Sequence, residues 1–136
     1  MIPNDAAIHA VTQNRTDRQR SRASLIALWL AQVALAVMFL MAGGSKLAGV
    51  PAMVSLFDAL GLGQWFRYVT GVIELASGIA LLVPSAAIFG ALLLIPTMLG
   101  AAAANLFLGQ SPAVPLVLLL VAVAVAWARR HQLRIS

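Results

Sequence analysis

Cysteine is absent from this chain of 136 residues, and its two histidines, His9 and His131, lie near opposite ends of it. Without thiols, the chain cannot form a disulfide, hold an iron–sulfur cluster or attach haem through cysteine. Two distant histidines also do not make the kind of ligand cluster that binds zinc. The sequence therefore contains no metal, haem or flavin motif and no catalytic constellation of its own.

Charge is also scarce. Charged residues make up 10% of the chain and hydrophobic residues 62%, whereas about a quarter of an ordinary soluble domain is charged. Seven arginines fall in the two terminal segments, namely Arg15, Arg18, Arg20, Arg22, Arg129, Arg130 and Arg134. Short basic segments next to apolar runs are typical of membrane orientation, whereas nucleic-acid binding needs a basic face on a folded module. We therefore expect a lipid bilayer, and not nucleic acid, as the environment of this chain.

Several apolar segments are long enough, or nearly long enough, to cross a bilayer, which takes about 20 residues. They cover residues 25–46, 67–83, 86–108 and 113–128. The pattern predicts an all-α integral membrane protein, a four-transmembrane-helix bundle within a membrane domain at 23–130. Residues 1–22 are expected to be a disordered basic tail, and residues 131–136 a second tail.

The connection between the first two spans has its own helical pattern. Met53, Leu56, Phe57 and Leu60 recur at helical spacing, and Pro51 suits a first helical turn. We expect a short amphipathic helix on the outer face. Because both tails are basic and four spans return the chain to its starting side, the positive-inside rule predicts that both termini are cytoplasmic.

Glu74 is an acidic residue inside an apolar span, which is costly and often marks a site. At about 100° per residue, Thr70, Gly71, Ser77 and Gly78 share its face. The first span brings Gln32, Gly43 and Lys46 to one face, and the third span brings Ala101 and Asn105 to another. If Glu74 is a ligand or proton site, we expect a cavity beside it, because the small residues Gly43, Gly71, Gly78 and Ala101 leave room that bulkier side chains would fill.

Lys46, Arg67, Glu74 and Asn105 all fall in the outer half of the predicted bundle, where we expect them to converge. Two interpretations of Glu74 stay open: a ligand or proton site, and a structural ion pair with Lys46 or a protonated, hydrogen-bonded group. For Asn105 and Gln32, a structural hydrogen bond between helices is favoured.

The residues also carry a family resemblance. The run Gly43-Gly44-Ser45-Lys46-Leu47, the run Gly71-Val72-Ile73-Glu74-Leu75 and the segment from Gly100 to Leu106 resemble the three helix signatures of the DoxX-like membrane proteins. The resemblance covers about residues 25–128. It implies a bacterial inner-membrane protein with four helices, and some relatives are associated with quinone-linked oxidoreductases. Many relatives carry a histidine where Asn105 stands, which argues against a proton or metal role at this position here.

Four functions remain open at this point. The first is an accessory subunit that binds a small apolar or amphipathic molecule such as a quinone. The second is a membrane subunit of a quinone-linked oxidoreductase, which would need a soluble or membrane redox partner. The third is a small proton-coupled transporter, which four short helices would form as a homodimer. The fourth is a purely structural membrane protein.

Overall fold

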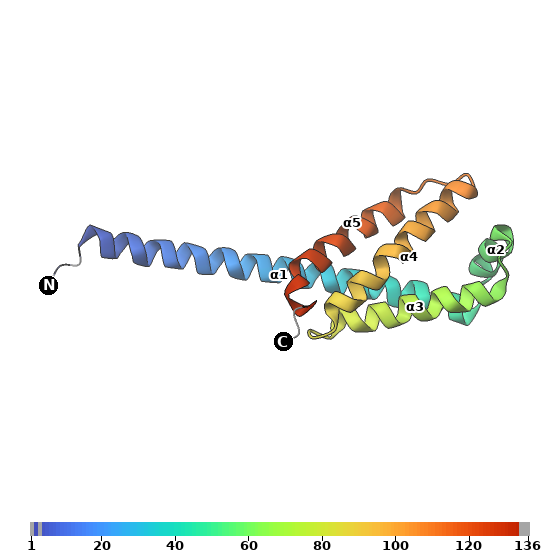
Figure 1. Ribbon diagram of the computed structural model, residues 1–136, viewed down its shortest axis with the longest axis horizontal. Coiled ribbons are helices and arrows are strands. Elements are labelled where there is room, and N and C mark those ends of the chain that lie inside the picture. The colour runs from blue at the N-terminus through green and yellow to red at the C-terminus, as the bar shows by residue number, and fades with distance from the viewer. Residues whose placement is uncertain (1, 3, 134–136) are drawn as a thin grey trace. The chain divides into compact units, whose positions relative to one another are not determined.

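The computed structural model describes residues 2 and 4–133, and every regular element within them is helical (Figure 1). The elements are α1 (Asp5–Ala48), α2 (Pro51–Leu60), α3 (Gln64–Leu82), α4 (Ala87–Phe107), α5 (Ala113–Ala128) and the short 3-10 helix η1 (Arg130–Leu133). The predicted all-α integral membrane class is confirmed. Residues 134–136 of the expected C-terminal tail lie outside the described residues.

The N-terminal part of α1 corrects the expectation of a disordered segment over residues 1–22. The helix begins at Asp5, and the Asn4 Oδ1 atom accepts a hydrogen bond of 2.9 Å from the Ala7 backbone N–H. This is an N-terminal cap, and the acidic Asp5 in the first turn also suits the positive end of the helix dipole. Alanine, arginine and glutamine, which are good helix formers, then continue the helix. The expectation was therefore wrong for residues 5–22.

Close helix packing dominates the part of the fold formed by residues 31–133. A Cβ atom added at Gly43 of α1 would lie 2.7 Å from the Gly71 carbonyl oxygen of α3. At the next contact, a Cβ atom added at Gly90 of α4 would lie 2.8 Å from the Ser77 carbonyl oxygen of α3. Helix α5 packs in turn along α4 (Figure 1). Small residues let membrane helices approach to backbone contact, which explains these positions.

The expected short helix between the first two spans is α2. Pro51 stands in its first turn, and Gly61, with φ of 72°, ends it in the left-handed conformation. Phe57 is buried and its ring contacts that of Phe66 in α3, with 6.0 Å between centroids. Asp58 is exposed, and its Oδ1 atom accepts a hydrogen bond of 2.7 Å from Gln64 Nε2 of α3. Helix α2 therefore contacts α3 through the buried Phe57 ring and through the carboxylate of Asp58.

Three of the described helices, α1, α3 and α4, are long and apolar enough to cross a membrane. Helix α5 is also apolar but has 16 residues. Large hydrophobic side chains on α4 and α5 stay exposed, among them Leu93, Leu99, Val117 and Leu120. Apolar surface of this extent suits contact with lipid, where water does not penalise it.

Candidate functional site

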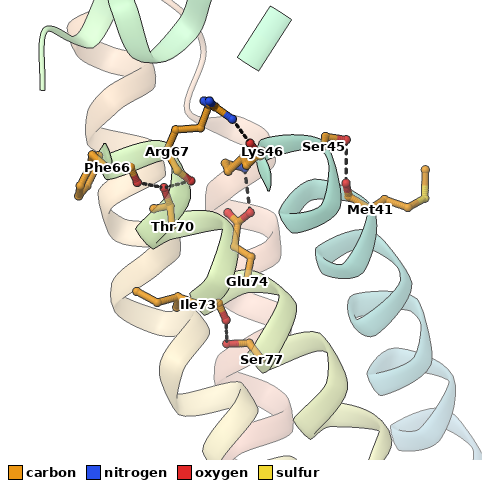
Figure 2. Close-up of polar contacts among 9 residues, drawn as sticks. All are labelled: Met41, Ser45, Lys46, Phe66, Arg67, Thr70, Ile73, Glu74 and Ser77. Atoms are coloured by element: carbon orange, nitrogen blue, oxygen red, sulfur yellow. Dashed lines mark hydrogen bonds and ion pairs between the residues drawn. The ribbon is translucent and has the colours of Figure 1, made fainter. Parts of the chain in front are cut away.

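An ion pair joins α1 to α3. Lys46 Nζ donates a hydrogen bond of 2.8 Å to Glu74 Oε2, and the two side chains are 13% and 6% exposed respectively (Figure 2). Lys46 lies in the last turn of α1, and Glu74 lies in the middle of α3. The predicted contact between these residues is therefore present. It is charge-assisted, so it is stronger than a neutral hydrogen bond.

The ion pair can form because Gly43 and Gly71 bring α1 and α3 into close contact. Gly43 lies one turn before Lys46 in α1, and Gly71 lies one turn before Glu74 in α3. A Cβ atom added at Gly71 would lie 3.1 Å from the Lys46 Cβ atom and 3.2 Å from the Gly43 carbonyl oxygen. One added at Gly78 would lie 3.0 Å from Leu40 Cγ and 3.1 Å from the Ala36 carbonyl oxygen. Helix α1 thus fills the space beside Gly71 and Gly78, and α3 fills the space beside Gly43. The expected cavity lined by Gly43, Gly71 and Gly78 is wrong, because these residues serve close packing.

Arg67 binds the C-terminal end of α1. Its Nη1 atom donates to the Lys46 carbonyl oxygen (Figure 2), and its Nε atom donates to Gln64 Oε1 at 2.6 Å. The last carbonyls of a helix lack partners within the helix and carry partial negative charge, so a buried guanidinium stabilises them. Arg67 is 5% exposed, and its guanidinium lies 4.3 Å from the centroid of the Tyr68 ring.

Gln64 and Asp58, which were not among the expected site residues, extend the cluster of Lys46, Arg67 and Glu74 toward α2. Gln64 Nε2 donates to Asp58 Oδ1 at 2.7 Å and to the Val54 carbonyl at 3.0 Å. A chain of polar contacts therefore runs from α2 through Gln64 and Arg67 to Lys46 and Glu74. The sequence could have indicated the contact between Asp58 and Gln64, because these two polar residues flank the turn that contains Gly61 and Gly63.

Asn105 does not take part in these contacts. Its Nδ2 atom donates to the Ser111 carbonyl at 2.9 Å, and its own carbonyl accepts from the Gln110 N–H at 2.7 Å. Asn105 therefore shapes the connection between α4 and α5. Of the four residues expected to converge, the structure joins Lys46, Arg67 and Glu74 by direct contacts and places the hydrogen bond of Asn105 elsewhere.

A second polar network joins three helices through Gln32. Gln32 is fully buried, and its Nε2 atom donates to the Leu81 carbonyl of α3 at 3.0 Å. Arg129, just after α5, donates from Nε to Gln32 Oε1 at 2.8 Å. Both groups of the Gln32 amide are therefore used within the bundle, which is the structural role expected for this residue.

Comparison with known proteins adds the family. The sequence profile of the DoxX-like family matches residues 30–127. The chain belongs to the DoxX-like family. The match spans all three residues of the Lys46–Arg67–Glu74 cluster and the helices that hold them. No curated protein and no solved structure matches this DoxX-like chain.

Proposed function

We propose that this DoxX-like protein is a non-catalytic accessory subunit of the bacterial inner membrane, and that Lys46 and Glu74 bind the polar head of a small amphipathic molecule such as a quinone. The ion pair supports this because it uses one N–H of Lys46 and one oxygen of Glu74. An ammonium group has three donors and a carboxylate accepts at both oxygens. Both residues therefore keep capacity to bind a polar head in an otherwise apolar setting.

The route to such a site follows from the packing. Because the seam between α1 and α3 is closed at Gly43 and Gly71, the ligand would approach from the partly exposed side of Lys46. Its apolar tail would lie along lipid-facing side chains. Electron transfer to a quinone would in addition need a redox group from a soluble or membrane partner.

One observation favours a second candidate function for the cluster, a structural lock. Arg67, Gln64 and Asp58 use their polar groups to fix α2 and the end of α1 to α3. In this interpretation the ion pair completes the lock and binds nothing else. The two candidates differ in whether a bound molecule depends on Glu74.

The ligand prediction is tested by mass spectrometry of small molecules that co-purify in mild detergent. We expect an amphipathic molecule bound to the wild type and lost from Glu74→Gln, since a lost charged hydrogen bond of about 1.5–3 kcal/mol weakens binding about 10–100-fold. Ser45→Ala is the matched control, because Ser45 adjoins Lys46 but donates only to the Met41 carbonyl of its own helix. Equal amounts bound to wild type and Glu74→Gln would support the structural lock.

We further propose four spans with both termini in the cytoplasm. Helix α5 supports a fourth span because it has no charged residue and packs along α4. The arginines of both terminal segments support the orientation.

Cysteine labelling tests this topology on a chain that has no cysteine of its own. We expect an impermeant maleimide to label Leu62→Cys in intact cells, because Leu62 is exposed in the turn between α2 and α3. Ala10→Cys and His131→Cys should react only after permeabilisation. Labelling of either terminal position in intact cells would contradict the orientation.

A further inference from the structure

The segment that follows α5 returns to the turn between α3 and α4. Its 3-10 helix, η1, packs against α4 (Figure 1). Within η1, the Gln132 Oε1 atom accepts a hydrogen bond of 3.1 Å from the backbone N–H of Ile88, and the Gln132 Nε2 atom donates to the Pro84 carbonyl. A single side-chain amide therefore binds both the α3–α4 turn and the first turn of the helix that follows it.

This contact supplies a cap that α4 lacks in its own sequence. The first N–H groups of a helix have no acceptor within the helix, and the side chain of an N-cap residue normally accepts from the second or third helical residue. The N-cap position of α4 is Ala86, which makes no side-chain cap. Ile88, the second residue of α4, is 1% exposed, so its N–H would be costly to leave without an acceptor. Gln132 provides that acceptor from 44 positions along the chain.

Arg129, which directly precedes η1, ties the same segment to the end of α3. Its Nε atom donates to Gln32 Oε1 at 2.8 Å, and Gln32 Nε2 donates in turn to the Leu81 carbonyl at 3.0 Å. Leu81 lies in the last turn of α3, where carbonyls lack partners within the helix. Residues 129–132 therefore hold the α3–α4 turn from both of its sides, through α1 on one side and directly on the other.

The local structure of η1 makes this attachment easier to release than the rest of the bundle. The helix has four residues, and two of them, Arg130 and His131, are exposed. A 3-10 helix has poorer hydrogen-bond geometry than an α-helix, and segments with few buried contacts open at lower free energy than the whole fold. The seam between α1 and α3, where Gly43 meets Gly71 at backbone distance, has no such weakness.

We propose that Arg129 and Gln132 form a clasp that closes the α3–α4 end of the bundle and that opens by local release of η1. Release of the clasp frees the first turn of α4 and the turn before it, while the far end of α4 stays folded. The clasp uses none of the residues of the Lys46–Glu74 site. It is therefore a conformational device that is separate from the function proposed for that site.

Amide hydrogen exchange, followed by NMR on the full-length chain in detergent micelles, tests the clasp. In Gln132→Ala we expect exchange at Ile88 and Gly90 to rise at least about fivefold, the factor that corresponds to the loss of an N-cap. Leu108, at the other end of α4, donates to a carbonyl of its own helix and should keep its rate. His131→Ala is the matched control, because His131 is the exposed neighbour of Gln132 in η1 and should leave all three rates unchanged.

Gln132→Glu separates capping from simple packing. A carboxylate still accepts from the Ile88 N–H and suits the positive end of the helix dipole, although it cannot donate to the Pro84 carbonyl. We therefore expect Ile88 to stay protected in this variant. Wild-type exchange at Ile88 in Gln132→Ala would overturn the proposal. An equal rise at Ile88 and Leu108 would also overturn it, because this would show a loss of global stability, as would equal loss of protection in the Glu and Ala variants.

Thiol reactivity gives a second measure of release in a chain that has no cysteine of its own. Ala87, in the first turn of α4, is fully buried. Ala87→Cys should react with a maleimide at least about fivefold faster when combined with Gln132→Ala, by the same loss of the cap. Combination with His131→Ala should not change the rate. Equal rates in the two combinations would contradict release of the clasp.

Discussion

Gly43→Ala should destabilise the protein, whereas the same change at the adjacent Gly44 should not. A Cβ atom at Gly43 would lie 2.7 Å from the Gly71 carbonyl oxygen and 2.8 Å from the Leu75 nitrogen. Both are backbone atoms, so α1 and α3 would have to separate. No atom lies within 4 Å of a Cβ atom at Gly44. The two glycines therefore differ only in whether a second helix occupies the space beside them.

The size of the effect follows from overpacking, which costs about 1–3 kcal/mol and occasionally more. We expect the upper part of this range, since moving α1 from α3 would also lengthen the Lys46–Glu74 contact one turn away. Unfolding by a denaturing detergent in mixed micelles measures the difference. Gly44→Ala should be neutral or stabilise the protein by up to about 1 kcal/mol, because alanine is the better helix former and the space beside Gly44 is free. Equal stability of the two variants would show that the close approach of α1 and α3 is not required.

The sequence predicted the fold class because long apolar runs, interrupted by Pro84 and by the glycines at 61–63, have few solutions other than helices in a membrane. The expectation of disorder was wrong at residues 5–22, where the pattern of hydrophobic residues does not indicate the helix. The relevant signal was instead local: the Asn4-Asp5 cap followed by residues with good helix propensity. Composition alone led to an expectation of disorder for a segment that these residues make helical.

Part of the site was predictable from helix faces. Lys46 and Glu74 lie on the small-residue sides of two helices, and opposite charges in a membrane pair when they can meet. The partners of Arg67 and Asn105 were not predictable in this way, because both side chains bind backbone carbonyls, Lys46 and Ser111, that no residue pattern marks. Small residues also permit two outcomes, a gap or a close approach. The distance between the helix axes decides between these two outcomes, and the sequence does not give it. At Gly43 and Gly71 the helices are in contact, so the expectation of a cavity there was wrong.

Breaking the Lys46–Glu74 pair from one side should be costly, and breaking it from both sides should be mild. Removing one partner of a buried ion pair costs about 3–5 kcal/mol, because the other charge stays buried without compensation. Lys46→Met should cost more than Glu74→Leu. The lysine stem lies in the last turn of α1 and can extend to water, whereas the shorter Glu74 side chain, 6% exposed, cannot.

The double variant of Lys46→Met with Glu74→Leu places two apolar side chains of similar volume in the same seam, and such replacements are often neutral or stabilising. We therefore expect its loss of stability to be far smaller than the sum of the single losses, with a coupling energy of about 0.5–3 kcal/mol or more. Unfolding in mixed micelles gives all four corners of the cycle. The matched control cycle combines Ser45→Ala with Glu74→Leu and should be additive, since Ser45 binds the Met41 carbonyl and not Glu74.

The same cycle separates the two roles proposed for the pair. If the double variant folds with wild-type stability and still co-purifies with the same small molecule, neither side chain binds that molecule and the pair serves only helix packing. If it folds but loses the molecule, Lys46 and Glu74 form the binding site, because the apolar pair preserves the seam while removing every donor and acceptor. Additive single and double effects would contradict the coupling itself, despite the 2.8 Å contact between Lys46 Nζ and Glu74 Oε2.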